Sequence, residues 1–486
     1  MADMAAASTI VRPGPWVDAQ VAAARDARLR LLIAGGGDDR IWLDPTTRRN
    51  RYGVPATPAP EELWFSSSTA CAISPRGWAA AGEALARLTE PGCHTIAAFF
   101  DTLRRRLLAL YGAPGAEAVL AASGTEAELV TLCLALSLAQ RPVANIIVAP
   151  AETGSGVPAA ASGLHFLGRA SLGGQVANAT RLAGWEDAAV TLETIEIRFP
   201  CGALRAQADV DLEAAMKVER AVAGGAFALL HVLDASKTGR PGVSRAAAGQ
   251  ILARHPGQVL VVVDACQLRC AAADVRRDLE QGLAVMITGS KFAGGPAFCG
   301  ALLLPAEIAD RLARAAPANA ALAPYCAVLD WPAVLRRPFA ANLAHAANLG
   351  LGLRWSAALA EIEAFEAVPA KWRTAMLADF DRAVRALIAA SPGLELADHG
   401  AATAAPGLVP ILHTGGADPR AVYQALTSGE GACRPCHHGQ PVAVGAALAL
   451  RVCASMPMIT AAAEHGFAAI ETDLDEAFES WARLRG

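Results

Sequence analysis

The chain has 486 residues, a hydrophobic fraction of 53% and a formal net charge of −4 at pH 7. This length is too great for one compact core, so we expect a well-buried globular protein of two or three domains. Charges of one sign do not gather in blocks, which argues against nucleic acid or a membrane surface as a partner.

The N-terminal stretch MADMAAAST has neither the basic segment nor the continuous apolar core of a secretory signal. The longest apolar helical stretch, residues 129–139, is much shorter than the roughly 20 residues that a membrane-spanning helix needs. Eleven cysteines at irregular spacings do not form a disulfide framework. We therefore expect a reduced, cytoplasmic protein.

The middle of the chain alternates short β-rich segments with helical patterns. The expected strands are NIIVAP (145–150), AFALLHVLDA (226–235), VLVVVDA (259–265), LAVMIT (283–288) and GALLLP (300–305). Segments that are apolar throughout are typical of strands buried on both faces. The alternation predicts an α/β fold with a mostly parallel sheet and helices on both sides.

The pattern changes after Pro332. Residues 341–390 form a long, nearly proline-free helical region that carries Trp355, Phe365 and Phe380 at its apolar positions. A shorter α+β segment follows, from about residue 393 to the end of the chain.

These patterns divide the chain into three predicted parts. An N-terminal arm covers residues 1–95, and a large α/β domain covers residues 96–310. Residues 311–486 supply an interdomain helix and a small C-terminal α+β domain.

Polar side chains stand where several predicted strands end, which is where open α/β sheets bind ligands. They are Glu152, Thr153, Asp234, Asp264, Ser290 and Lys291. These groups would converge on one edge of one sheet, as a cofactor site requires.

Asp264 and Lys291 each have an ordinary interpretation. Asp264 could cap a helix, with Gln267 completing a capping box, and Lys291 could be a solvated loop residue. However, Asp264 ends the most apolar strand, where an uncompensated carboxylate is costly. Lys291 follows 27 positions later, at the end of the next predicted strand.

A buried carboxylate facing a ring nitrogen, with a lysine amine near a carbonyl carbon, is the arrangement that pyridoxal phosphate (PLP) requires. The aspartate keeps the ring nitrogen protonated, and the lysine holds the cofactor as an imine and moves protons. The cofactor phosphate would bind at Ser123, Gly124 and Thr125, which open an apolar helix. The alternative is an ordinary N-cap with Glu126 in the first turn.

The order SGT, DACQ and GSK-x4-P resembles the fold-type-I PLP enzymes, and within them the class V aminotransferase and cysteine desulfurase group. The resemblance covers about residues 60–460. It implies that Lys291 binds the cofactor covalently, that Asp264 pairs with the pyridine nitrogen and that Gln267 reaches the phenolic oxygen. The phosphate ligands that it implies are Gly124, Thr125, Thr288 and Ser290.

Two further segments are similar to the family with substitutions. HVLDASKTG resembles the strand that passes the cofactor ring, with Ala235 and Ser236 in place of the usual asparagines, so Asp234 and Ser236 are candidate contacts. Thr153 stands where the family usually presents a histidine that stacks on the ring. Such stacking contributes about 0.5–1.5 kcal/mol, and loss of the imidazole also removes a proton carrier.

The segment CRPCHHGQP (433–441) resembles the desulfurase segment that ends in the sulfur-accepting cysteine. Gly439 stands in the place of that cysteine, and Cys436 lies three positions earlier. Cys433 and Cys436 could form a metal or redox site, but a zinc site needs four ligands and no second pair follows. We expect two small, partly buried thiols and no metal.

Two arginines match the family positions that bind the substrate carboxylate, Arg434 and Arg451. A guanidinium binds a carboxylate in bidentate fashion, although Arg451 could also be a surface residue at a strand end. Residues 49–52 and 66–69 would line the substrate entrance or form polar loops.

The resemblance implies a homodimeric PLP-dependent transferase, most simply an aminotransferase that acts on a small amino acid or amine. One alternative is a Cβ lyase or a cysteine desulfurase with a displaced or absent cysteine. Another is a PLP-binding protein without turnover.

Overall fold

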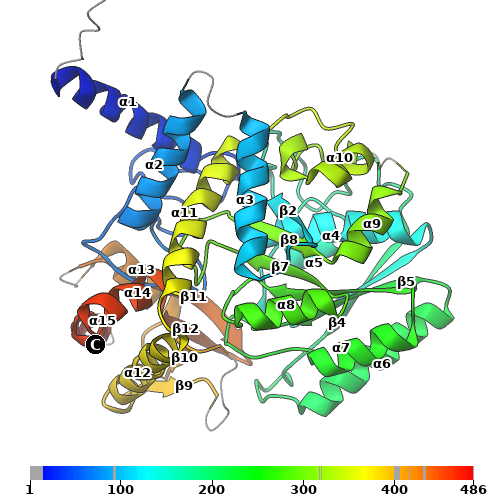
Figure 1. The fold of residues 1–486 in the computed structure, drawn as a ribbon. Helices are drawn as coiled ribbons and strands as arrows, with labels where there is room; N and C mark the ends of the chain where they lie inside the picture. The colour runs from blue at the N-terminus through cyan, green and yellow to red at the C-terminus, as the bar shows by residue number, and fades with distance from the viewer. Residues whose placement is uncertain are drawn as a thin grey trace, which may run out of the picture.

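The computed structural model describes residues 15–90, 95–316, 318, 320–398, 405–414, 416–430 and 434–484. Two β-sheets and the helices that cover them make up this part of the chain (Figure 1). Among the described helices, none is both long enough and apolar enough to span a membrane.

The larger sheet has seven strands in the order β2-β8-β7-β6-β5-β3-β4. Their bounds are β2 Glu117–Ala121, β3 Val143–Val148, β4 Val190–Ile195, β5 Phe227–Leu233, β6 Val259–Ala265, β7 Ala284–Thr288 and β8 Gly300–Leu304. Strand β8 is antiparallel to both its neighbours, whereas the pairs from β7 through β4 are parallel. The mostly parallel sheet and its five expected strands are confirmed.

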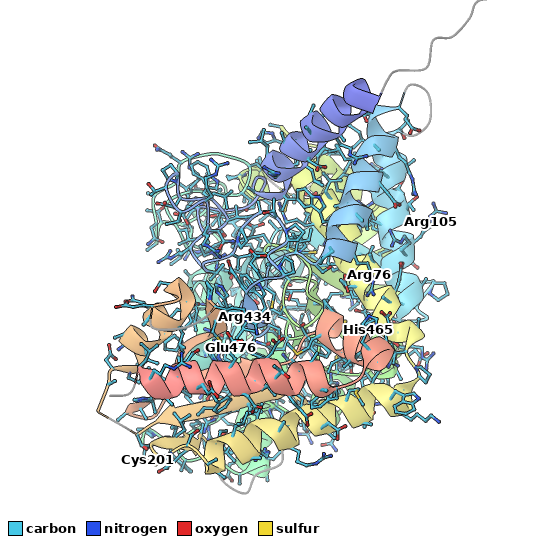
Figure 2. All side chains as sticks on the ribbon, turned by 90° about the vertical axis from the view of Figure 1, so that its left-hand side faces the viewer. Arg76, Arg105, Cys201, Arg434, His465 and Glu476 are labelled. Carbon is cyan, nitrogen blue, oxygen red and sulfur yellow. The ribbon has the colours of Figure 1, made fainter. Side chains whose placement is uncertain are left out.

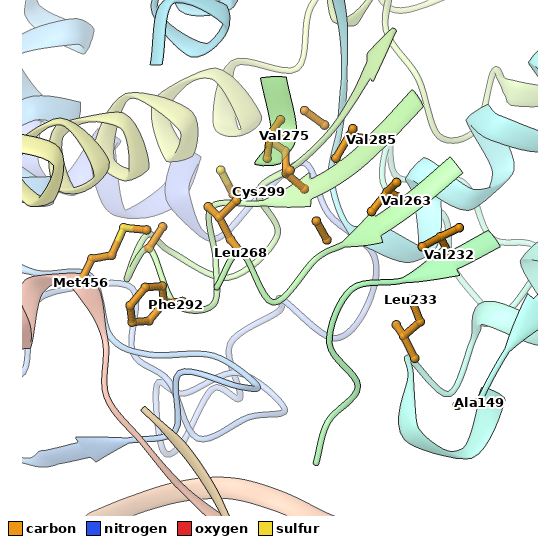
Figure 3. Close-up of a cluster of buried hydrophobic side chains, with 14 of the residues drawn as sticks. Ala149, Val232, Leu233, Val263, Leu268, Val275, Val285, Phe292, Cys299 and Met456 are labelled. Atoms are coloured by element: carbon orange, nitrogen blue, oxygen red, sulfur yellow. The ribbon is translucent and has the colours of Figure 1, made fainter. Parts of the chain in front are cut away.

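Apolar helices bury both faces of this sheet. One face packs against α4 (Gly124–Ala139), α9 (Ala306–Ala313) and α10 (Ala333–Phe339). The other face packs against α3, α6, α7 and α8, which span Ile96–Leu110, Gln207–Ala223, Arg245–Arg254 and Ala272–Glu280. Figure 3 shows this second face, where Val232, Val263 and Val285 lie side by side on β5, β6 and β7.

The smaller sheet has the strand order β1-β11-β12-β10-β9. Its bounds are β1 Leu63–Phe65, β9 Leu394–Leu396, β10 Leu408–His413, β11 Cys436–Val444 and β12 Ala447–Cys453. Strand β1 pairs in parallel with β11, so a segment of the expected N-terminal arm is built into the C-terminal sheet. The domain boundaries at residues 95 and 310 remain a proposal.

The remaining helices connect or cover these sheets. They are α1 Pro15–Ile33, α2 Pro75–Thr89, α5 Val157–Ala161, α11 Leu349–Ala367, α12 Ala370–Ala389, α13 Pro419–Ser428, α14 Met456–His465 and α15 Ala468–Arg483, with short 3₁₀ turns at Pro150–Glu152, Ala320–Leu322 and Val328–Asp330. The long helical region expected near residues 341–390 is thus two helices. The break falls at Val368 and Pro369, where the residue before a proline disfavours helical geometry.

Helix α11 connects the N-terminal segment to the large sheet. Trp355 is fully buried, and its indole Nε1 donates to the carbonyl of Gly300 at 2.9 Å. Arg354 is also fully buried and donates to backbone carbonyls of Phe298 at 2.6 Å and Gly36 at 2.8 Å. The helix therefore ties the N-terminal segment to the end of the large sheet.

We predict that Trp355→Ala lowers the free energy of unfolding by about 3–5 kcal/mol, because it leaves a cavity beside the large sheet. Trp355→Phe should cost less, since it keeps most of the packing and loses the hydrogen bond. The matched control is Trp372→Ala, because Trp372 is 51% exposed and such a change should alter stability by about 0.5 kcal/mol or less. Thermal and denaturant unfolding measure both, and equal effects of the two alanine variants would contradict the prediction.

Candidate active site

A pocket opens at the carboxyl ends of the parallel strands. It encloses about 1040 Å³, counting its open mouth, and the two sheets and the N-terminal segment contribute its walls. Of the cofactor-site residues predicted from the sequence, those that line it are Ser123, Gly124, Thr125, Thr153, Asp264, Gln267, Thr288, Ser290 and Lys291. Glu152 also lines it, as do Tyr52, Ser68 and Thr69 from the two segments expected at the substrate entrance. The strand ends thus bring together side chains that lie as much as 168 positions apart, from Ser123 to Lys291.

Asp264 ends β6 and lies on the pocket wall. Its Oδ1 accepts a hydrogen bond from the backbone N–H of Cys266 at 3.0 Å. No helix begins there, because α8 starts only at Ala272, so the capping-box interpretation of Asp264 is wrong. The Nε2 of Gln267 instead donates to the carbonyl of Ser68 at 3.3 Å, and its buried Oε1 has no hydrogen-bond partner.

His231, on β5, lies behind this wall and was not predicted from the sequence. Its Nε2 is 3.1 Å from the Oε1 of Glu128, and both side chains are buried. Burial opposes protonation, but the carboxylates of Glu128 and Asp264 raise the pKa of His231 above its ordinary value. When protonated, His231 therefore places a positive charge near both carboxylates.

The N-terminus of α4 forms the opposite wall. Ser123 caps the helix, and its hydroxyl accepts from the N–H of Glu126 at 3.2 Å. Ser123 therefore both caps α4 and lines the pocket. At Gly124, a Cβ atom would lie 2.8 Å from the sulfur of Cys266, so only glycine lets the backbone come this close.

Lys291 lies in a tight turn after β7. The turn is closed by hydrogen bonds from Gly294 N to the carbonyl of Lys291 and from Gly295 N to the carbonyl of Gly289, both at 2.9 Å. Cβ atoms at Gly289 and Gly295 would each lie 2.6 Å from Cβ of Ala358 on α11. The small residues around the lysine are thus explained by close packing of this turn on α11.

Thr153 lines the pocket, and its hydroxyl donates to the carbonyl of Pro150 at 3.2 Å. The neighbouring Glu152 is buried and accepts from Arg198 Nε at 2.5 Å and from the Ser236 hydroxyl at 2.7 Å. Ser236 therefore supports Glu152 and is not one of the pocket-lining residues. Asp234 also points elsewhere, because it pairs with Arg245 at 2.9 Å, and neither residue is placed as a cofactor contact.

The two arginines proposed for the substrate carboxylate have different positions. Arg434 pairs with Glu476 at 2.6 Å and Asp473 at 2.7 Å on α15, and Figure 2 shows Arg434 and Glu476 next to each other. It does not line the pocket, so this geometry gives no support to its assignment as a substrate-binding residue.

Arg451 is fully buried on β12, which rules out the surface interpretation. Its Nη2 donates to the carbonyl of Gln440 at 2.5 Å and to the hydroxyl of Thr69 at 3.2 Å, and both of these residues line the pocket. Its Nε and Nη1 have no hydrogen-bond partner among the residues that the structure describes. Arg451 does not itself line the pocket, so its guanidinium lies directly behind Thr69 and Gln440 with donors unused.

The segment around Gly439 belongs to strand β11. Cys436 pairs with Leu63 in β1 and is fully buried, and burial raises the pKa of its thiol far above the ordinary value. A Cβ at Gly439 would lie 2.5 Å from Oγ of Ser68 and 2.8 Å from Nε of Arg451, so a side chain there would force one of these residues to move. Cys433 lies outside the described residues.

Within the described ranges, no group of three or more histidine, cysteine, aspartate or glutamate side chains could hold a metal ion.

Three charged pocket residues were not predicted as site residues from the sequence: Glu128, described above with His231, Arg40 and Lys237. Arg40 pairs with Asp38 at 2.6 Å, and its guanidinium lies 5.2 Å from the ring centre of Phe298. No local pattern marks it as a site residue. Lys237, in the turn after β5, also lines the pocket. Burial, together with the nearby charges of Arg451 and Lys291, lowers the pKa of Lys237 to about 7.

Comparisons with known proteins identify the fold. No family model matches the chain, and no curated protein sequence matches it either. A cysteine desulfurase from Escherichia coli is 14% identical with a TM-score of 0.55 over 87% of this chain and 94% of its own. A cysteine desulfurase from Thermococcus onnurineus is 16% identical with a TM-score of 0.56 over 87% of this chain and 95% of its own.

The serine palmitoyltransferase of Sphingomonas wittichii is 13% identical, with a TM-score of 0.52 over 96% of this chain and 98% of its own. At such low identities the likeness establishes the architecture. The chain has the fold of the fold-type-I PLP-dependent enzymes, with a large and a small domain.

Proposed function

We propose that this chain is a PLP-dependent enzyme that acts on a small amino acid or amine, most simply as an aminotransferase. The observation that carries the proposal is the meeting of Lys291, Asp264 and the N-terminus of α4 in one pocket. An amine, a carboxylate and an anion-binding helix end are the three groups that hold this cofactor.

The residues present fit the cofactor. The carboxylate of Asp264 faces the pocket from the end of an otherwise apolar strand. The buried Oε1 of Gln267 has no partner, which leaves an acceptor free for a polar group in the pocket. Gly124, Thr125, Thr288 and Ser290 line the wall that would receive the phosphate.

When bound, PLP supplies a conjugated ring that withdraws electrons from the carbon next to the substrate amine. Asp264 would keep the ring nitrogen protonated. The Nζ of Lys291 would take a proton from the substrate carbon and return it to a neighbouring position. Arg451 would orient the substrate through its carboxylate.

The described thiols argue against sulfur transfer. Cys436 is sealed within a sheet. Cys266 lines the pocket, but burial and the charge of Asp264 raise its pKa well above the ordinary value. A thiol that stays protonated is a poor nucleophile. Aminotransfer needs no thiol, and neither does a Cβ lyase reaction, which we keep as the second candidate.

We also propose a homodimer in a reduced, cytoplasmic setting, with neither nucleic acid nor a membrane as a partner. Leu31 on α1 is 75% exposed and Trp42 is 46% exposed, which gives the N-terminal segment apolar surface that a second copy could cover. The described cysteines in the chain form no disulfide. Sedimentation velocity tests the dimer.

We predict that borohydride reduction of the yellow holoprotein fixes the cofactor to the peptide that contains Lys291. Lys291→Ala should abolish this label and lower turnover by about 10²–10⁴-fold, because the proton carrier is lost. Lys237→Ala is the matched control, since it removes the other pocket lysine, and it should leave the label on Lys291. Peptide mapping decides the matter, and a label on Lys237 in the unaltered protein would show that the assignment is wrong.

We predict that Asp264→Asn lowers turnover by about 10²–10³-fold, because a neutral amide cannot stabilise a protonated ring nitrogen. The thermal midpoint should change little, since no helix depends on Asp264 as a cap. Asp274→Asn is the control, because Asp274 lies in the first turn of α8, outside the pocket. Unchanged turnover in Asp264→Asn would contradict the proposed role.

We predict that amino-acid substrates yield a keto acid with transfer of the amine to an added keto acid. With cysteine, sulfide and alanine release should be negligible and should be the same in Cys266→Ser and Cys436→Ser. Product analysis separates the candidates: pyruvate without amine transfer would indicate the lyase, and alanine formation that disappears in one serine variant would indicate a desulfurase.

A further inference from the structure

The pocket contains a second lysine that the proposed reaction does not use. Lys237 lies in the turn that follows β5, and its backbone N–H donates to the carbonyl of Glu152 at 2.8 Å. The turn is closed by Ser236 N, which donates to the carbonyl of Arg240 at 2.8 Å. The base of this side chain is therefore held in place by backbone hydrogen bonds.

The side chains on either side of Lys237 point elsewhere. The hydroxyls of Ser236 and Thr238 both donate to Oε2 of Glu152, and both residues are buried. Of these three consecutive residues, Lys237 is the one that lines the pocket. The turn thus places the amine of Lys237 at the pocket wall.

This amine has no counterion among the residues that the structure describes. Glu152 is the carboxylate that influences it most, but Glu152 is already bound by Arg198, Ser236 and Thr238. The other charges that act on Lys237 are the cations Arg451 and Lys291. This side of the pocket therefore carries positive charge that the protein does not neutralise.

One amino-acid carboxylate cannot neutralise both remaining cations. Arg451 has two unpartnered donor atoms beside Thr69 and Gln440, and a single carboxylate would occupy them. Lys291 is committed to the cofactor under the proposed function. Lys237 is then left without a partner, at a cost that a second anionic group would remove.

We propose that the substrate carries two acidic groups, and that Lys237 selects the second while Arg451 binds the first. This inference rests on the proposed function, which it deepens by naming the substrate class: a dicarboxylic amino acid or a close analogue. Lys237 is a specificity-determining residue in this scheme. The hydroxyls of Ser68 and Thr69 line the same pocket and could donate further hydrogen bonds to either acid.

The protonation of Lys237 supports the same conclusion. Burial and the cations Arg451 and Lys291 lower its pKa to about 7, against the opposing effect of Glu152. A bound anion favours the charged amine and raises the pKa again. The pocket should therefore take up a proton as a diacid binds, and the binding should weaken as the pH rises above 7.

The first test needs no turnover. Isothermal titration of the holoprotein compares succinate with succinamate, which replaces one carboxylate by a neutral amide. The unaltered protein should bind succinate about tenfold to a hundredfold more tightly, which is the effect of one charged hydrogen bond. Lys237→Met should remove the preference, Lys237→Arg should restore much of it, and the exposed Lys371→Met should leave it unchanged.

Equal binding of succinate and succinamate by the unaltered protein would overturn the inference, as would an undiminished preference in Lys237→Met. The same holds if Lys237→Met shifts the cofactor absorbance without any ligand and leaves the succinate preference intact. In that case Lys237 would serve the cofactor and not the substrate.

The second test separates this inference from the proposed function. The absorbance of the bound cofactor is titrated with aspartate and glutamate, and with asparagine and glutamine as neutral matches. The acids should act at lower concentrations than the amides, by about tenfold or more, and Lys237→Met should equalise them. If no amino acid perturbs the spectrum while succinate is still preferred, the proposed function fails and the diacid site stands. If all four amino acids act equally, the proposed function stands and the diacid site fails.

Discussion

The close packing of the turn at Gly289–Gly295 on α11 is the constraint on which the site depends. Cβ atoms at either glycine would come within 2.6 Å of Ala358, so the turn can approach α11 only without side chains. Trp355 and Arg354, on the same helix, are fully buried and hold the strand end and the N-terminal segment together. Lys291 is thus presented by a rigid turn, which lets a flexible side chain act at a defined place.

A network of buried charges connects the pocket wall to the small domain. Arg198 binds Glu152 at 2.5 Å and Asp398 at 2.7 Å, and Arg240 binds Asp398 at 2.9 Å. Burial opposes ionisation of Asp398, but the two guanidinium groups lower its pKa below the ordinary value. Because Asp398 follows β9 and Glu152 follows β3, movement of the small domain would act on Glu152 and on the adjacent Thr153 of the pocket. Removing one partner would leave a buried charge uncompensated, which makes the network cooperative.

The sequence predicted the elements whose signal is local. Strands β5, β6 and β7 are apolar throughout, and the groups at their ends follow from the geometry of a parallel sheet. Strand β2 was missed because two of its five residues are alanine, which favours helix. Strand β4 was missed because it is a partly exposed edge with polar residues such as Glu193. The joining of β1 to β11 could not be predicted, since it pairs segments more than 370 positions apart, as Leu63 with Cys436 shows.

The orientation of side chains within a turn was the least predictable feature of the site. In the segment from Asp234 to Thr238, the sequence favoured Asp234 and Ser236 as cofactor contacts. Their orientation is instead set by partners distant in the sequence. Asp234 pairs with Arg245, and the hydroxyls of Ser236 and Thr238 donate to Glu152. Lys237 has no counterion among the described residues, because the nearby carboxylate of Glu152 is already bound by Arg198, Ser236 and Thr238.

The same reasoning links Gly439 to substrate recognition. In the sequence, Gly439 stands only as the replacement of a cysteine. In the structure the glycine is needed for packing, because any side chain there would displace Arg451 or Ser68. Arg451 and a thiol at residue 439 cannot share this wall in its present form. If Arg451 binds the substrate as proposed, residue 439 must stay small. A sulfur-accepting cysteine, which would act from that position, is therefore not compatible with this arrangement of Arg451.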